Sequence, residues 1–455
     1  MYSRRQFLSK TGRAGASALA LGSLGLSKTM LATENFADYK ALVCILLAGG
    51  NDSYNMLVPY DNDQYTEYRT LRSDLALEQS TLLPLNQGTP DGRNLALHQG
   101  MPEVQTLYAN QDLSFLANVG TLLEPVDAIS VENGAQVPLG LYSHADQIQQ
   151  WQTARSEKRV ADGWAGRIGD LFQGTNLVDD IPMNVSLSGT NVFQSGIQTS
   201  EYAITPRDNG ASGILFYNNN TDFGDYKKRV IDNLLEHQPS HSLRREYQTR
   251  LKAAVASSEF FIEAMDTGHE ITTNFSDHYF SQSLRQIARV IAARDALGAV
   301  RQTFFIQFHG WDHHDDVLPQ QEVMLPQLSK GLSEFRDALV EIDMFDSVTT
   351  FTTSDFGRTL TSNGKGSDHG WGGHHIAMGG RVRGGRIFGD YPLLSPNSPL
   401  DVGRGIYVPT TSVDEYFAEL ALWFGVSSND LVQILPNINR FYSPYSTDTP
   451  IGFLT

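Results

Sequence analysis

The sequence predicts an α/β protein with a mostly parallel central sheet flanked by helices. Two observations lead to this fold class. Short apolar runs rich in β-branched residues alternate with longer stretches of helical periodicity, which is the pattern of an α/β layer. The 455 residues, 40% of them hydrophobic, also suffice for one large core. Because the chain has no internal repeat or low-complexity tract, we expect a single domain over residues 33–455.

Five runs are expected to form strands and six stretches to form helices. The strands are Ala41–Leu47, Leu113–Val119, Met183–Leu187, Thr303–Phe308 and Val348–Thr353. The helices are Pro102–Asn110, His144–Arg155, Leu243–Met265, Phe280–Leu297, Gln320–Ile342 and Val413–Phe424. The Asn-, Gly-, Ser- and Thr-rich residues 189–225 predict an irregular insertion. Gly379–Gly389 predicts a hairpin that turns at Gly384 and Gly385.

Residues 1–32 have the features of an export signal. A charged start with Arg4 and Arg5 precedes a small-residue apolar run, Ala14–Leu26, and a short polar stretch that ends at Ala32. The apolar run is too short and too rich in glycine to predict a transmembrane helix. The paired arginines and the Gln-Phe-Leu after them resemble the twin-arginine signal, whose route exports folded proteins. We therefore expect the twin-arginine export machinery as a partner, a periplasmic or extracellular location, and no stable membrane insertion.

Charge and cysteine content exclude several classes of protein. Lys and Arg total 34 against 51 Asp and Glu, which gives a formal charge of −17. Residues 1–32 hold five basic and no acidic residues, so the rest of the chain carries −22. A chain this acidic is not expected to bind nucleic acid. The single cysteine, Cys44, excludes an intramolecular disulfide and a thiolate metal cluster, so any metal site must use His, Asp and Glu.

Three of the expected strands are each followed by an aspartate. These residues are Asp52, Asp312 and Asp355. Parallel strands point their carboxyl ends at one edge of a sheet, where open α/β folds place their sites, so the three carboxylates should converge. Uncompensated carboxylates raise one another's pKa, and a cation between them resolves the repulsion. For Asp52 a simple turn is the alternative, because Gly and Asn-Asp pairs are common turn residues.

Histidines gather in the same part of the chain. Six of the twelve lie between residues 309 and 375: His309, His313, His314, His369, His374 and His375. Imidazole and carboxylate ligands without thiolate suit Zn, Mn or Fe better than Ca or Mg, and one or two such divalent metal ions per chain are expected. The spacing of Asp312 and His314 places both on one face of an extended loop. His309 and the pair His374-His375 are equally consistent with packed or loop-lining histidines.

Three further residues are candidates for catalysis. Ser143 precedes a helical stretch, where it is either a capping serine or a nucleophile near the positive end of the helix dipole. Arg358 is either a clamp for an anionic substrate or a surface or ion-paired arginine. His144 is a candidate to stabilise charge that develops on a transferring group.

Five segments together resemble a known bacterial family. They are Leu-Leu-Ala-Gly-Gly-Asn-Asp-Ser-Tyr-Asn-Met-Leu-Val-Pro-Tyr (46–60), Tyr-Ser-His-Ala-Asp (142–146), His-Gly-Trp-Asp-His-His (309–314), Thr-Ser-Asp-Phe-Gly-Arg-Thr (353–359) and Gly-Ser-Asp-His-Gly (366–370). Over nearly all of the chain after residue 32, the sequence resembles the family known as domain of unknown function 1501. That family is grouped with the alkaline phosphatase superfamily. The resemblance therefore implies an alkaline-phosphatase-like three-layer sandwich.

The resemblance also implies roles for single residues. Asp52 and Asp355 resemble metal-binding carboxylates of the superfamily. Asp312 and His314 resemble ligands of its other metal site, and His369 resembles its late histidine. Ser143 matches the superfamily nucleophile by placement only.

Two departures from the superfamily stand out. Phe356 occupies the position of a histidine ligand and cannot bind metal, so one site lacks a ligand unless His309, His374 or His375 substitutes. The chain also lacks the Cys/Ser-x-Pro-x-Arg segment of the sulfatases, which disfavours a conventional sulfatase.

These features favour an exported metal-dependent hydrolase of phosphate or related anionic esters. The alternative is a non-catalytic binding or assembly protein of the cell envelope that keeps the fold, because Phe356 replaces a ligand and the nucleophile is not evident. An exported redox enzyme is disfavoured. The chain has no Gly-x-Gly-x-x-Gly after a strand and no Cys-x-x-Cys-His.

Overall fold

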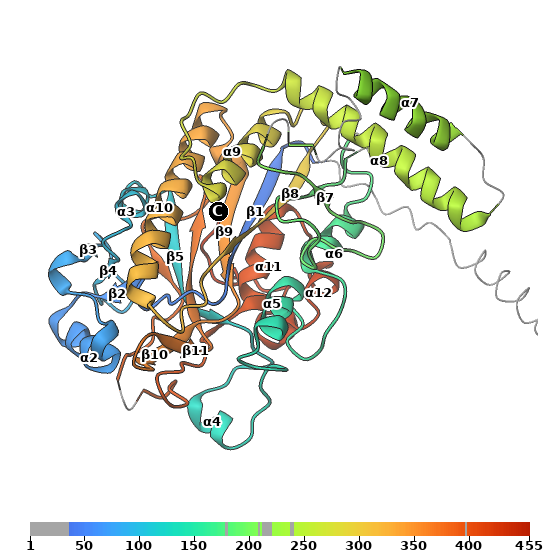
Figure 1. Cartoon of the computed structure of the whole chain (residues 1–455). Coiled ribbons are helices and arrows are strands. Elements are labelled where there is room, and N and C mark those ends of the chain that lie inside the picture. Colours follow the sequence, from blue (N-terminus) through green and yellow to red (C-terminus); the bar gives the residue numbers. More distant parts are fainter. Residues whose placement is uncertain (1–35, 178–180, 208–209, 212–220, 237–240, 396–397) are drawn as a thin grey trace, which may run out of the picture.

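The computed structural model describes residues 36–177, 181–207, 210–211, 221–236, 241–395 and 398–455, which form a central sheet with helices on both faces (Figure 1). The expected export signal lies outside these residues. The strands of the sheet are β1 (Lys40–Ala48), β5 (Leu113–Gly120), β6 (Asn184–Ser186), β7 (Tyr202–Ala203), β8 (Arg301–His309), β9 (Val348–Ser354), β12 (Gly373–Met378), β13 (Ile387–Phe388) and β14 (Thr411–Ser412). Their order is β13-β5-β12-β9-β1-β8-β6-β7, and β14 also pairs with β5. Only β12 runs antiparallel to its neighbours, so the mostly parallel sheet is confirmed.

The sheet is the middle of three layers. Successive residues of β1 enter different cores, with Val43 and Ile45 on one face and Leu42 and Leu46 on the other, as the pleat of a strand requires. The first face is covered by α3 (Pro102–Ala109), α9 (Tyr279–Ala292) and α10 (Val317–Glu341). The second face is covered by α5 (His144–Thr153), α6 (Trp164–Leu171), α11 (Val413–Phe424) and α12 (Leu431–Ile434). A strand buried on both faces reads as the continuous apolar run seen in the sequence.

Smaller elements surround these layers. The short strands β2 (Leu57–Pro59), β3 (Leu83–Pro84) and β4 (Leu95–Leu97) form a second sheet, and β10 (Arg358–Ser362) pairs with β11 (Ser367–His369). The remaining helices are α2 (Asn62–Arg72), α4 (Ala128–Glu132), α7 (Asp222–Glu236) and α8 (Ser242–Thr267). All five expected strands and all six expected helices are present, with ends that shift by a few residues.

The hairpin expected over Gly379–Gly389 is wrong. β12 and β13 lie on opposite sides of β5, so the chain between them crosses the end of that strand. The crossing is tight. The Gly385 amide donates to the Leu113 carbonyl over 2.9 Å, and a Cβ on Gly384 would lie 1.9 Å from the Gln111 carbonyl oxygen. The glycine pair therefore permits a close approach of two backbones, which is the other common reason for glycine at such a position.

α7 and α8 form a two-helix arm, here called the arm, that projects from the body of the protein (Figure 1). In α8 the buried residues are Phe261, Ala264 and Met265, all near its C-terminal end. Of the insertion expected over residues 189–225, the described part contains β7 and the start of α7, and residues 208–209 and 212–220 lie outside the described residues. Among the residues that the structure describes, no helix is long and apolar enough to cross a membrane.

Candidate metal centre

The candidate site lies where β8, β1 and β9 end side by side. Ala48 of β1 is in register with His309 of β8, and Leu47 with Ser354 of β9, so the loops that follow start from one edge of the sheet. Asp355 follows β9 directly, and Asp312 lies three residues beyond β8. The carboxylates of Asp312 and Asp355 both contact the ring of His144, at the start of α5.

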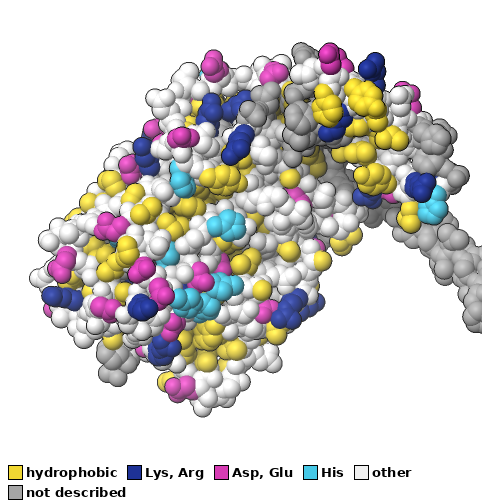
Figure 2. All heavy atoms as spheres, viewed as in Figure 1, with side chains coloured by type: hydrophobic (Ala, Val, Ile, Leu, Met, Phe, Trp, Pro, Cys, Tyr) yellow, Lys and Arg dark blue, Asp and Glu magenta, His cyan; other side chains and the backbone are white. Residues whose placement is uncertain are grey.

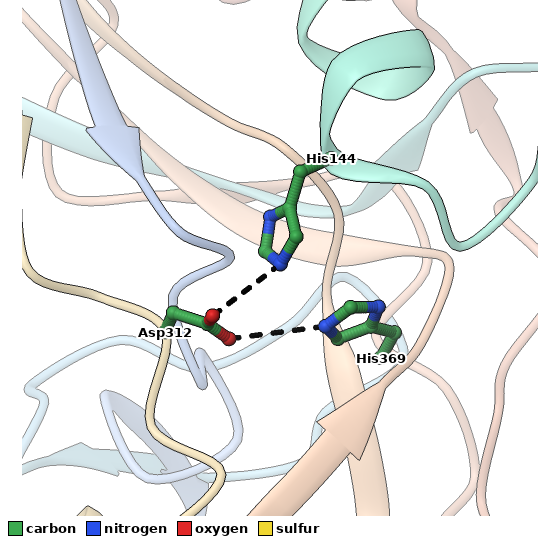
Figure 3. A group of neighbouring side chains, drawn as sticks. All are labelled: His144, Asp312 and His369. Carbon is green, nitrogen blue, oxygen red and sulfur yellow. Dashed lines mark ion pairs between the residues drawn. The ribbon is translucent and has the colours of Figure 1, made fainter.

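His144, Asp312 and His369 form a compact group of possible metal ligands (Figure 3). One ligand atom from each residue lies within 4.8 Å of the other two. The carboxylate of Asp312 is 3.5 Å from Nε2 of His144 and 3.8 Å from Nε2 of His369. Three segments that are far apart in the sequence thus bring side-chain ligand atoms close to one point.

His314 extends this group. Its Nε2 atom lies 3.3 Å from the Asp312 carboxylate and 2.8 Å from Nε2 of His369. The donor set at this point is then three imidazoles and one carboxylate, with no thiolate. Such a set suits Zn, Mn or Fe.

Each of the three imidazoles is oriented by an oxygen atom at Nδ1. His144 Nδ1 contacts the Asp355 carboxylate over 2.6 Å, and His369 Nδ1 contacts the Tyr142 carbonyl over 2.7 Å. His314 Nδ1 lies 3.3 Å from the Asp368 carboxylate. Because these oxygens are acceptors, they favour the tautomer with hydrogen on Nδ1, which leaves the Nε2 lone pair free for a metal. Partners of this kind are the usual outer shell of metal-binding histidines.

Neighbouring charges and burial shift the pKa of two residues in the group, His369 and Asp312. Burial lowers the pKa of the His369 imidazole, and the charge of Arg358 lowers it further, which favours the neutral ring. Burial raises the pKa of Asp312, but the hydrogen bond and the charge of Arg358 outweigh this effect, so the pKa lies below its ordinary value. Asp312 is therefore an anion at neutral pH.

Arg358 holds several segments of this site together through hydrogen bonds. Its side chain is fully buried and donates to the carbonyls of Gly49, Gly50 and Ser367 as well as to the Asp312 carboxylate. These partners belong to the loops after β1 and β8 and to β11. The sequence left open a substrate clamp or an ion-paired arginine, and this placement matches the second.

Asp52 reaches the same edge of the sheet but faces a different partner. Its carboxylate forms a fully buried ion pair with Arg72 over 2.7 Å and accepts a bond of 2.7 Å from the Ser367 hydroxyl. Asp355 is buried as well, with one carboxylate oxygen on the Gly49 amide and the other on His144. The metal-ligand roles expected for Asp52 and Asp355 stay predictions.

Phe356 follows Asp355 directly in the sequence. Its ring is buried and lies 4.8 Å from the ring of His144 and 4.4 Å from that of His369, measured between centroids. Of the proposed substitutes, His374 and His375 are core residues whose pKa burial lowers to about 3. They pack against Tyr391 and Trp151, respectively.

Ser143 is the N-cap residue of α5, and its side chain makes no capping hydrogen bond. Its hydroxyl helps Arg159 to lower the pKa of Asp146. The nucleophile role stays a prediction.

Sequence reasoning missed two features of this site. The catalytic role expected for His144 stays a prediction, and the structure places its ring in the candidate ligand group. Asp368 and Tyr142 orient ligands, yet only their adjacency to His369 and Ser143 in the sequence marked them. The contact of the Tyr142 backbone carbonyl could not be predicted from residue type, because every residue has such a carbonyl.

Comparison with known proteins gives a family and a set of remote structural likenesses. The sequence matches the family model described as "Protein of unknown function (DUF1501)" over residues 39–435. A search of curated proteins found no match.

Among solved structures, the chain is similar to the C-terminal periplasmic domain of EcEptC from Escherichia coli in complex with Zn. The identity is 9%, the alignment covers 92% of this chain and 93% of that chain, and the TM-score is 0.34. It is also similar to the PsFucS1 sulfatase from Pseudoalteromonas sp., with 9% identity, 86% and 68% coverage and a TM-score of 0.34. Because the family model covers most of the sequence, the chain belongs to the DUF1501 family.

Proposed function

We propose that the protein is an exported metal-dependent hydrolase of phosphate or related anionic esters. The observation that carries the proposal is the orientation of three imidazoles, each with Nδ1 on an oxygen and Nε2 toward the Asp312 carboxylate. In this proposal His144, Asp312, His314 and His369 hold one divalent metal ion. Zn, Mn and Fe fit this donor set.

The chain's own residues have distinct tasks in this proposal. A metal bound here would polarise an ester oxygen and lower the pKa of a bound water. Asp355, Asp368 and the Tyr142 carbonyl orient the imidazoles, and Arg358 orients Asp312. Phe356 excludes water from one side of the His144 and His369 rings. Ser143, at the start of α5, remains the candidate nucleophile if the reaction passes through an enzyme ester.

Export by the twin-arginine route is part of the proposal. The Arg4-Arg5 start supports it, and folding before export suits a protein whose metal ligands come from distant segments. The net charge of −17 disfavours the approach of anionic substrates, but the charge of a bound cation acts at short range where the substrate binds.

Metal analysis together with an ester panel tests the proposal. We expect purified wild-type protein to carry close to one transition metal per chain by inductively coupled plasma mass spectrometry. The variants His314→Ala and His369→Ala should lose it, while the matched control His269→Ala, at an exposed position after α8, should keep it. Wild type should hydrolyse at least one of p-nitrophenyl phosphate, bis(p-nitrophenyl) phosphate and p-nitrophenyl sulfate.

A non-catalytic envelope protein is the second candidate. Phe356 in a ligand position and the Arg72 ion pair of Asp52 favour it, because each removes a ligand that a second metal would need. Bound metal in wild type without turnover of any of the three esters would support this candidate over the hydrolase. Absence of bound metal in folded wild type would contradict the site itself.

A further inference from the structure

The arm carries an apolar stripe that faces solvent. On α7 the side chains of Phe223, Tyr226, Val230 and Leu234 follow one another at spacings of three, four and four residues, which places them on one side of the helix. Their exposed fractions are 61%, 60%, 40% and 68%. Large apolar side chains in such a row normally lie against a partner.

The stripe continues on α8. Leu243 and Tyr247, four residues apart, are 73% and 70% exposed. Contacts between the helices show that they run antiparallel: Lys228 pairs with Glu259 over 3.4 Å, and Gln248 donates to the Leu234 carbonyl over 3.0 Å. The N-terminal turns of α8 therefore lie beside the C-terminal end of α7, and the two rows meet at the tip of the arm. Figure 2 shows apolar side chains gathered on the arm.

The exposed area of the stripe is sufficient for a dimer. From the exposed fractions, the six side chains present on the order of 600 Å² per copy, so two facing stripes bury about 1,200 Å² before any flanking residues are counted. This value lies at the lower end of the range for specific interfaces.

The charges of the arm do not favour one direction of packing. The first turn of α7 carries Asp222 and Asp225, but Lys227, Lys228 and Arg229 follow in the next turn. On α8, Arg244 and Arg245 are followed by Glu246, which pairs with Arg250 over 2.8 Å. Each end of the arm therefore carries both signs of charge, and the apolar stripe is the surface that drives pairing.

We propose that the arm is a homodimerisation element, in which the stripes of two copies pack against each other about a two-fold axis to form a four-helix bundle. A self-complementary surface of this kind is what a two-fold interface requires. The arm lies at the other end of the molecule from α5 and β11, so the dimer leaves both candidate metal centres open to solvent (Figure 1). The inference is independent of the proposed function.

Sedimentation equilibrium of the full chain tests the proposal. We expect wild type to have twice the monomer mass at micromolar concentration. The double variant Leu234→Glu/Tyr247→Glu should weaken self-association at least about 100-fold, because it places four charges in a two-fold apolar interface. The matched control Thr249→Glu/Ala256→Glu adds the same charge at exposed positions elsewhere on α8 and should remain dimeric. Far-UV circular dichroism checks that every variant is folded.

A monomeric wild type, or a dimer that survives Leu234→Glu/Tyr247→Glu, would overturn the proposal. A monomeric wild type that instead co-sediments with anionic phospholipid vesicles would assign the stripe to a membrane surface.

Discussion

Nε2 of His314 and Nε2 of His369 lie 2.8 Å apart, although the oxygen partners of both rings direct hydrogen to Nδ1. Two nitrogen lone pairs at this distance repel each other unless a proton or a cation lies between them. The Asp312 carboxylate beside both atoms stabilises positive charge there, whether it is carried by a shared proton or by a metal ion. This pair of residues therefore marks the point where the site gathers positive charge.

Loss of charge at Asp355 should weaken metal binding without abolishing it. In the proposed centre Asp355→Asn leaves all ligands in place but weakens the bond that orients His144. Removing such an outer partner typically lowers metal affinity about 10–100-fold. Competition with a chelating dye measures the affinity. Asp146→Asn, in the same helix as His144, is the control and should leave the metal affinity unchanged. Equal metal affinity in both variants would show that Asp355 does not position a ligand.

Asp52 should matter for stability and not for metal content. Asp52→Asn weakens a fully buried ion pair with Arg72, and breaking such pairs costs about 3–5 kcal/mol. We expect a clear fall in the midpoint of urea unfolding with one metal still bound per folded chain. Ser367→Ala removes the other partner of the same oxygen and is the milder variant. Loss of bound metal in either folded variant would show that Asp52 takes part in metal binding.

Gly50 should tolerate alanine less well than Gly92, although both have a left-handed backbone with φ of +85° and +86°. A Cβ at Gly92 meets open space, so Gly92→Ala should cost about 1 kcal/mol of backbone strain. A Cβ at Gly50 would lie 2.5 Å from the ring of Phe356. Gly50→Ala should therefore cost about 3 kcal/mol. Thermal unfolding of both variants measures the difference in stability. Equal losses of stability would show that the Phe356 ring can move aside at no cost in free energy.

Asp414 should make the protein less stable as the pH rises. Burial raises its pKa to about 8, Glu157 and Glu415 add to the shift, and Arg167 and Arg440 oppose it. The folded state then binds a proton that the unfolded state releases near pH 4, so stability falls with increasing pH between about 4 and 8.

Asp414→Asn removes this proton linkage. Neither carboxylate oxygen of Asp414 has a hydrogen-bond partner among the described residues. The variant should be more stable than wild type at pH 8, on the order of 2 kcal/mol, and the difference should shrink toward pH 5. Urea unfolding at both pH values checks this. The same pH slope in wild type and variant would contradict a protonated Asp414.

The paired arginines at the start of the chain should decide export. With Arg4→Lys/Arg5→Lys we expect the protein to remain in the cytoplasm, because the twin-arginine signal requires the pair. Cell fractionation of a bacterial host followed by immunoblotting measures the distribution. Arg13→Lys is the control and should be exported like wild type. Equal export of the Arg4-Arg5 variant would point to another route.

Much of the fold follows from the sequence, because the sheet strands are buried on both faces and read as apolar runs. The run Ala41–Leu47 is the core of β1, and the loops after β1, β8 and β9 meet as parallel topology requires. The crossing at Gly384 was not predictable, because a close approach between backbones and a hairpin turn both select glycine.

The site was predictable only in part for a similar reason. Residue type marked Asp312, His314 and His369, but the partner of a buried carboxylate depends on tertiary packing. Arg72 approaches Asp52 from α2, twenty residues along the chain, and nothing in the local pattern marks the pair. The position of His144 against Asp312 depends equally on how α5 packs on the sheet.

Arg358 donates to backbone carbonyls of the loop after β1, of Trp311 in the loop after β8 and of β11, and carbonyls are present whatever the side chains are. These contacts of Arg358 therefore depend on the path of the backbone in those loops, which Gly49 and Gly50 set because a Cβ at either position would clash. Side-chain identity matters more at the surrounding surface, where Arg404 pairs with Asp368.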